Sequence, residues 1–255
     1  MVSNLLHHRP RWLSPLVVLV AVLTILPAQS ARADSFMEEA TFNLESVAEG
    51  HDYEYRWNGS SFVLVNRYPL GTLNTSTNAA SAPNRSGLTL VATVCLQLDK
   101  PKSYGRHCWH KYKPAAGDSD PDNKYRLYYV TGSSKSKTGY KLTRVVDRID
   151  SGNDNHVTVD WAPTGTTSAG SCSDKTVTLG VDGRGFSGSV SSTFTTCPET
   201  FGLDFIGPRQ FRFDWEGKRS AGSWVGMGGG VMYRIPENGN PNMNALLGHG
   251  VCSNC

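Results

Sequence analysis

The chain has 255 residues, with 25 Lys and Arg against 22 Asp and Glu. The entire positive excess lies in the first 33 residues, which contain three Arg and no acidic residue, so the remaining chain has no net charge. This neutrality argues against nucleic acid as a partner, which calls for a basic surface. No apolar run is long enough to span a membrane as a helix, which takes about 20 residues.

The first 33 residues have the three parts of a secretory signal peptide. Residues 7–11 contain two His and two Arg, residues 16–26 form an apolar run of 11 residues, and residues 31–33 read Ala-Arg-Ala, an A-x-A cleavage site. We therefore expect a secreted, extracellular protein that begins near Asp34 and has no membrane contact after cleavage.

Residues 34–56 are predicted to form a short acidic helix or a flexible arm. Ser35 and Glu38 have the spacing of a capping box, and Phe36, Ala40 and Leu44 recur at helical spacing before the stop signal Gly50. The segment has seven acids and one base, whereas residues 100–148 have twelve bases and four acids. Either these two regions dock on each other or each faces solvent. This segment, with Glu38, Glu39 and Glu45, is the first candidate for contact with a partner.

From residue 51 onward the apolar residues alternate with a period of two. Alternating stretches are separated by turn clusters such as Asn58-Gly59, Asp182-Gly183 and Glu216-Gly217. This pattern predicts an all-β protein, an antiparallel β-sandwich that is jelly-roll-like or barrel-like. We place a hairpin and linker at residues 57–84 and the main sandwich at residues 85–255.

Six cysteines remain after residue 33, and an even number in an exported chain predicts disulfides. Proximity in the sequence favours three pairs, which are Cys95 with Cys108, Cys172 with Cys197, and Cys252 with Cys255. The last pair forms a C-x-x-C that, together with His249, would otherwise hold a metal ion or act in redox chemistry. No helix can follow Cys255 in this sequence to lower a thiol pKa, so a structural disulfide is preferred.

Two further motifs carry ligand-type residues. Asp118, Asp120 and Asp122 occupy alternate positions, as in calcium-binding loops, but the segment departs from the EF-hand pattern, and a solvated hairpin loop is the preferred explanation. Calcium is the only cofactor that the sequence suggests. His107 and His110 form an H-x-x-H, but residues three apart on a strand point to opposite faces, so a shared metal is not expected.

No catalytic motif is recognisable. Gly222-Ser223-Trp224-Val225-Gly226 lacks the strand-to-helix context of a nucleophile elbow. The glycine-rich run 226–230 has no following Lys-Ser/Thr, which favours a hairpin or bulge over a phosphate loop.

Aromatic residues provide the remaining candidate surface, because exposed Trp residues bind protein and sugar surfaces. Trp57 and Trp109 are flanked by charged residues and are expected to be exposed. The leading hypothesis is a secreted, non-catalytic β-sandwich that binds a protein or glycan, as a subunit of an extracellular assembly. The alternatives are a secreted hydrolase acting on glycan or peptide, with a carboxylate or His site, and a secreted toxin or inhibitor.

Overall fold

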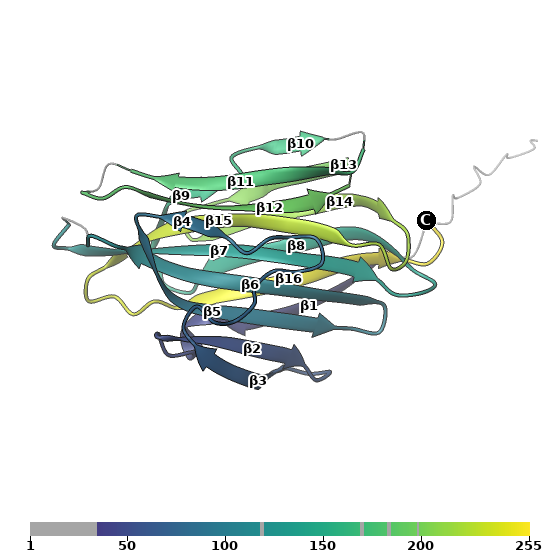
Figure 1. The fold of residues 1–255 in the computed structure, drawn as a ribbon, viewed down its shortest axis with the longest axis horizontal. Coiled ribbons are helices and arrows are strands. Elements are labelled where there is room, and N and C mark those ends of the chain that lie inside the picture. The colour runs from purple at the N-terminus through teal and green to yellow at the C-terminus, as the bar shows by residue number, and fades with distance from the viewer. Residues whose placement is uncertain (1–34, 118–119, 169–170, 183–184, 198) are drawn as a thin grey trace, which may run out of the picture. The chain divides into compact units, whose positions relative to one another are not determined.

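The computed structural model describes residues 35–117, 120–168, 171–182, 185–197 and 199–255. These residues form sixteen strands and a single short 3-10 turn at Leu44–Ser46, with no α-helix among them (Figure 1). The predicted all-β fold class is confirmed. In the part of the chain that is described, no helix has the length and apolarity needed to cross a membrane. The predicted signal peptide lies outside the described residues.

Three sheets make up the fold. The first sheet, called sheet A here, has six antiparallel strands in the order β1 (Ser35–Asn43), β16 (Met243–Cys252), β8 (Lys141–Ser151), β14 (Gln210–Arg219), β13 (Glu199–Ile206) and β10 (Thr166–Ser168). The second sheet, sheet B, has seven strands in the order β3 (Phe62–Pro69), β2 (His51–Trp57), β5 (Leu88–Asp99), β6 (Ser103–Pro114), β7 (Asn123–Ser136), β15 (Val225–Pro236) and β9 (Val157–Ala162). The third sheet, sheet C, has the order β11 (Ser173–Val181), β12 (Gly188–Thr196) and β4 (Asn84–Ser86). All the pairs are antiparallel except that of β2 with β5.

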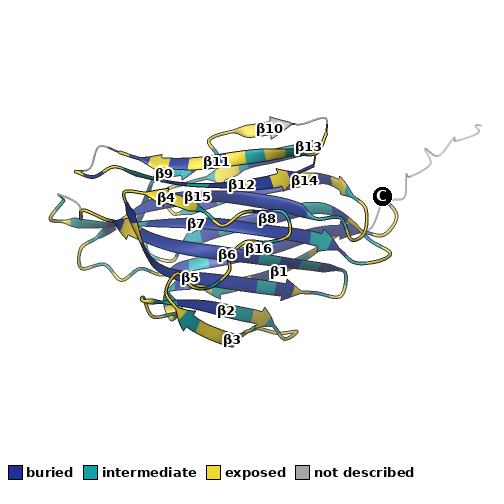
Figure 2. Ribbon diagram, in the orientation of Figure 1, coloured by how far each residue is buried: buried dark blue, intermediate teal, exposed yellow. Residues whose placement is uncertain are grey.

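Sheet B is the middle layer, with sheet A against one face and sheet C against part of the other. The glycine-rich run in β15 shows why the layers come so close. A Cβ added to Gly228 would collide with Ser192 and Phe194 of sheet C, whereas one added to Gly229 would meet Phe213 of sheet A at 3.0 Å. The prediction of a hairpin or bulge at residues 226–230 is therefore wrong, because glycine is needed there for close packing on both faces. Figure 2 shows these central strands as the most buried part of the fold.

The N-terminal segment is a strand, so the prediction of a helix or flexible arm is wrong. β1 pairs with β16 along its whole length, from Ser35 with Cys252 to Asn43 with Asn244. Phe36 and Ala40 share one face of this strand, because positions four apart also coincide at a period of two, and Leu44 follows the strand in the 3-10 turn. Glu38 lies on the same face, between Phe36 and Ala40. Because it is acidic, the apolar alternation expected of a strand is not visible in the sequence.

The predicted hairpin is present, but residues 70–83 do not behave as a linker between domains. β2 and β3 pair across the turn at Asn58-Gly59. The loop that follows is folded back onto sheet B, where the Asp52 carboxylate accepts hydrogen bonds from the amides of Gly71 (2.7 Å) and Leu73 (3.2 Å). Residues 33–255 accordingly form one compact unit.

The three cysteine pairs are those that sequence proximity favours, namely Cys95–Cys108, Cys172–Cys197 and Cys252–Cys255. Cys95 and Cys108 face each other on the neighbouring strands β5 and β6 and are fully buried.

Candidate functional site

The two tryptophans predicted to be exposed differ in their surroundings. Trp57 is half-buried at the end of β2, with the Lys100 ammonium 3.9 Å from its ring centre and Phe62 at its edge. Trp109 is only 1% exposed and belongs to the core, so its predicted surface position is wrong. Its neighbours in sequence, Cys108 and His110, project from the opposite face of β6, so their character does not indicate whether Trp109 is exposed.

The acidic segment docks on the basic region, which decides between the two alternatives that the sequence left open. Glu45 pairs with Lys111, Glu49 lies 3.3 Å from the same ammonium, and Glu54 pairs with Arg106 at 3.4 Å. Because Glu38 and Glu45 are half-buried in internal contacts, Glu39 is the one member of the predicted acidic trio that is exposed.

A chain of buried polar side chains connects sheets A and B (distances between heavy atoms). It starts at Asp147 of β8, whose carboxylate lies 2.8 Å from Nδ1 of His107 on β6. His107 Nε2 lies 2.8 Å from Ser134 Oγ on β7, which lies 2.8 Å from Nε2 of His249 on β16. On its other side, His249 Nδ1 lies 2.8 Å from Ser103 Oγ. Ser103 Oγ in turn lies 2.5 Å from the half-buried carboxylate of Glu38 on β1, where the chain ends.

The direction of these hydrogen bonds determines the protonation of both rings. Ser103 donates to the Glu38 carboxylate, so its oxygen must accept from His249 Nδ1. His249 Nε2 then accepts from Ser134, and Ser134 accepts from His107 Nε2. Since a carboxylate can only accept, Asp147 receives its hydrogen bond from Nδ1 of His107. Burial, and then the charge of His107, lower the pKa of His249 well below its ordinary value, so His249 is neutral.

Glycines on the facing strand positions make room for these rings. Gly132 pairs with His107, and a Cβ on it would lie 2.4 Å from the imidazole. Gly105, which pairs with Ser134, is similarly covered by His249, whose Nε2 would lie 2.6 Å from a Cβ. The chain of polar groups is thus built into the backbone of sheet B.

The arrangement Asp147–His107–Ser134 has the composition of a hydrolytic triad but not its accessibility. The three side chains have no exposed surface, and Ser134 Oγ is already engaged on both sides by histidine nitrogens. A nucleophile must reach the reacting carbonyl atom, so this arrangement stabilises the contact between sheets A and B instead. Sequence reasoning missed the whole buried polar chain to which it belongs, because the members of that chain come from five different strands.

A groove lies where the edge strands β1 and β3 and the residue 58–61 turn meet, a region we call the open edge. It consists of two adjoining hollows of about 770 and 430 Å³, both lined by Glu39 and Trp57. Phe42 and Phe62 contribute aromatic surface to the second hollow. Glu38, where the buried polar chain ends, lines the first. The predicted binding residues Trp57, Glu38 and Glu39 are therefore brought together here, whereas Trp109 and Glu45 are not.

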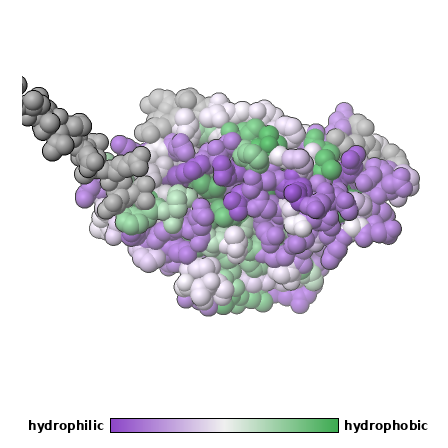
Figure 3. Space-filling view, turned by 180° about the vertical axis from the view of Figure 1, so that it is seen from behind, coloured by the Kyte–Doolittle hydropathy of each residue, from purple (hydrophilic) through white to green (hydrophobic). Residues whose placement is uncertain are grey.

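Exposed apolar side chains are concentrated along the two edge strands that border the open edge. Of the seven large apolar residues with substantial exposure in the described chain, six belong to β1, β3 and the residue after β3, namely Phe36, Met37, Val63, Leu64, Val65 and Leu70. The seventh is Phe205 on β13. Figure 3, the view from behind, shows apolar surface along the lower edge, where Figure 1 places β2 and β3.

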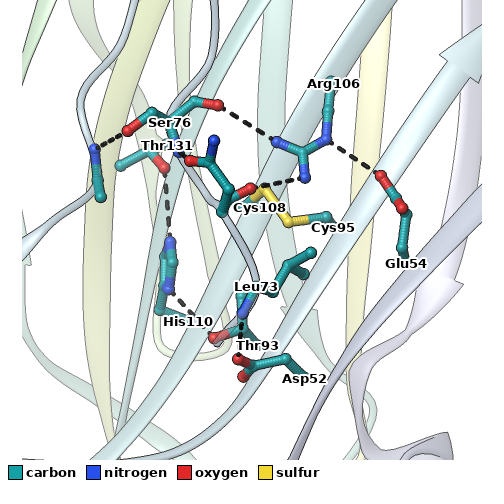
Figure 4. Close-up of a disulfide and its surroundings, with 12 residues drawn as sticks. Asp52, Glu54, Leu73, Ser76, Thr93, Cys95, Arg106, Cys108, His110 and Thr131 are labelled. Atoms are coloured by element: carbon teal, nitrogen blue, oxygen red, sulfur yellow. Dashed lines mark hydrogen bonds and ion pairs between the residues drawn. A yellow bond between two sulfur atoms is a disulfide. The ribbon is translucent and has the colours of Figure 1, made fainter. Parts of the chain in front are cut away.

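The outer face of sheet B carries a second polar region beneath the folded-back loop (Figure 4). Arg106, on the same face as the Cys95–Cys108 disulfide, donates to the carbonyl oxygens of Asn74 (2.9 Å) and Ser76 (3.4 Å) in addition to its pair with Glu54. His110 lies buried between Thr93 and Thr131, and burial lowers its pKa to about 3. The two histidines of the H-x-x-H thus face opposite layers, as predicted.

The predicted calcium loop is only partly described. Asp118 lies outside the described residues, and the Asp120 carboxylate accepts hydrogen bonds from the Asp122 amide (3.1 Å), Asn123 (2.9 Å) and the Tyr125 hydroxyl (3.1 Å). Both oxygens of the Asp120 carboxylate are therefore engaged by neighbouring residues. Over the residues with described positions, no group of three His, Cys, Asp or Glu side chains has a metal-binding arrangement.

Comparison with known proteins adds no identity to this geometry. No protein-family model matches the chain, and no curated protein matches it significantly. The function must therefore be argued from the site.

Proposed function

We propose that this protein is a secreted, non-catalytic binding module that docks another protein against its open edge. One observation carries the proposal, which is that six of the seven exposed large apolar residues of the described chain lie on its two edge strands, β1 and β3, or directly after β3. Soluble monomers rarely expose contiguous apolar patches unless the patch serves an interaction. The three disulfides fit an oxidising compartment outside the cytoplasm, which supports secretion as part of the proposal.

The partner meets side chains rather than extending the sheet. β3 is an edge strand, and an unprotected edge would pair with any free strand. Here Val65 has no counterpart on β2, because Glu54 pairs with Asn66 and the next residue, Tyr55, pairs with Leu64. This bulge and Pro69 at the end of β3 interrupt the hydrogen-bonding edge. Binding through the apolar side chains of Val63, Leu64, Phe36 and Met37 is then the expected mode.

Charged groups at the rim of the groove are suited to orient the partner. Glu39 is exposed, and Asp99 pairs with Lys137 at 2.6 Å beside it, with both side chains nearly half exposed. An apolar centre with a polar rim is the usual composition of a protein interface. The hydrolase alternative has less support, because the one triad-like set in the described chain is sealed from substrate. No described feature distinguishes a toxin or inhibitor.

The test is capture of partners from the culture fluid of the source organism with the immobilised protein. Leu64→Lys and Met37→Lys should abolish capture of the specific partner, since each places a charge in the apolar surface. Phe205→Lys is the matched control, because Phe205 is exposed to a similar degree on a strand outside the open edge. Capture of the same proteins by all four forms would overturn the proposal.

A further inference from the structure

A separate cleft lies on the outer face of sheet B. The loop that follows β3 passes over strands β2, β6 and β7 and leaves an open cleft of about 650 Å³ beneath residues 72–78. None of its lining residues lines the groove at the open edge. The loop is held in place by Asp52 at one end and by Arg106 further along, so the cleft is a preformed feature of the fold.

Two hydroxyl groups that line this cleft are buried without a partner. Ser133 is fully buried, and its Oγ has no hydrogen-bond partner in the described structure. Thr77, contributed by the loop, is half-buried, and its Oγ1 atom is likewise buried without a hydrogen-bond partner. Buried hydroxyl groups are normally satisfied, so a pair of unsatisfied hydroxyls lining one cleft indicates that a polar ligand completes their hydrogen bonds.

The charges in the cleft are compensated within the protein. Glu54 and Arg106 pair with each other, and Arg106 also donates to the carbonyl oxygens of Asn74 and Ser76. An anionic or cationic ligand would have no free opposite charge to meet. The site therefore fits a neutral ligand with many hydroxyl groups.

Two tyrosines line the cleft beside these polar groups. Burial raises the pKa of Tyr104, so its phenol remains a hydrogen-bond donor. Its ring is held edge-on against Trp224, with the ring centres 5.7 Å apart. Tyr68 accepts a hydrogen bond from Asn66 and lines the same cleft. Aromatic faces next to hydroxyl and amide groups match a sugar ring, which has apolar C–H faces and polar edges.

We propose that this cleft binds a neutral saccharide through Ser133, Thr77 and the two tyrosines. Binding here is independent of the protein contact proposed at the open edge. Ser133 anchors one sugar hydroxyl at the floor, Thr77 contacts it from the loop, and Tyr104 and Tyr68 flank the ring. The neutral charge of the cleft excludes uronic acid and amino sugar polymers as preferred ligands.

The test uses the purified full-length protein and isothermal titration calorimetry. The probes are cellohexaose, maltohexaose, xylohexaose and N-acetylated chitohexaose, with polygalacturonate and chitosan as charged controls. At least one neutral oligosaccharide should bind at micromolar to millimolar concentration, and the charged polymers should not bind more tightly. Failure of all four neutral probes to bind, or tighter binding of a charged polymer, would overturn the proposal.

Variants assign the binding to the cleft. Ser133→Ala should lower the affinity for the oligosaccharide by about 3- to 10-fold, which is the usual contribution of one hydrogen bond. The thermal stability should stay unchanged or rise, because the deleted hydroxyl has no partner within the described protein. Tyr104→Phe, which removes the phenol hydroxyl of another residue lining the cleft, should also lower the affinity. Ser61→Ala, in the turn at the open edge, should bind sugar as the wild type does. Unchanged affinity in both cleft variants would refute the assignment, and the open-edge variant Leu64→Lys should leave sugar binding intact.

Discussion

His107 and Asp147 form an ion pair from which water is completely excluded, with the imidazole Nδ1 2.8 Å from the carboxylate. The two residues belong to different sheets, so this pair joins sheets A and B at the centre of the sandwich. Such a pair is satisfied only as a unit, because each partner would be costly to bury alone.

Asp147→Asn should therefore destabilise the protein strongly. It removes the charged partner of the fully buried His107 ring, and a loss of about 3–5 kcal/mol is typical when a buried pair is broken in this way. Urea unfolding followed by fluorescence measures the change. Asp99→Asn is the control, since the Asp99–Lys137 pair is largely exposed and is expected to contribute below about 1 kcal/mol. Equal effects of the two substitutions would contradict the assigned role of the buried pair.

Gly132→Ala should displace the His107 ring. The added Cβ would lie 2.4 Å from the imidazole, and overpacking of this kind costs about 1–3 kcal/mol. Gly180→Ala is matched to it as a strand glycine with open space at the Cβ position, and a change within about 0.5 kcal/mol is expected. The comparison fails if Gly132→Ala unfolds at the same urea concentration as the wild type.

Acid should destabilise the fold through His110. The pKa of this residue falls from 6.5 to about 3 on folding, so the unfolded state binds more protons between these values. Stability contributed by the neutral ring is complete above pH 6.5 and decreases as the pH falls toward 3, by at most about 1.4 kcal/mol per pH unit. The unfolding free energy of His110→Phe should decline less steeply over this range than that of the wild type. A parallel decline in His110→Phe and wild type would disprove the assignment.

Replacement of Cys95 and Cys108 by Ala should lower stability more than replacement of Cys252 and Cys255. In the chain-entropy description, the stabilisation by a disulfide increases with the logarithm of the number of residues in the loop that it closes. The sequence separations are 13 and 3, and the expected losses are about 3 and 1.5 kcal/mol. Thermal unfolding of the two double variants provides the measurement, and the reverse order would contradict the expectation.

The sequence predicts most of the sandwich, because alternation and turn residues are local signals. It predicts the cysteine pairs for the same reason, since partners near in sequence are near in space here. It fails at β1, where the spacing of Phe36, Ala40 and Leu44 fits both a helix and a strand. The deciding residue is Glu38, an inward-facing acid that only the distant Ser103 explains.

The two sites were predictable only in part. Trp57 and the acidic strand were singled out from local composition, and both line the groove at the open edge. The polar chain joins residues as far apart as Glu38 and His249, and the hydroxyls of the saccharide cleft come from Thr77 and Ser133. Spacing along the chain carries no information about such contacts, which arise from strand order and register.

The pairing of β1 with β16 has a consequence for how the protein matures. Ser35 lies opposite Cys252, so the strand that is synthesised first among those described stays without its neighbour until the strand that is synthesised last is available. Contacts so distant in sequence form slowly. During biosynthesis the chain must pass through a stage in which β8 and β1 both expose unpaired backbone. A nascent chain released before β16 is complete would lack His249, which joins Ser134 to Ser103 in the buried polar chain.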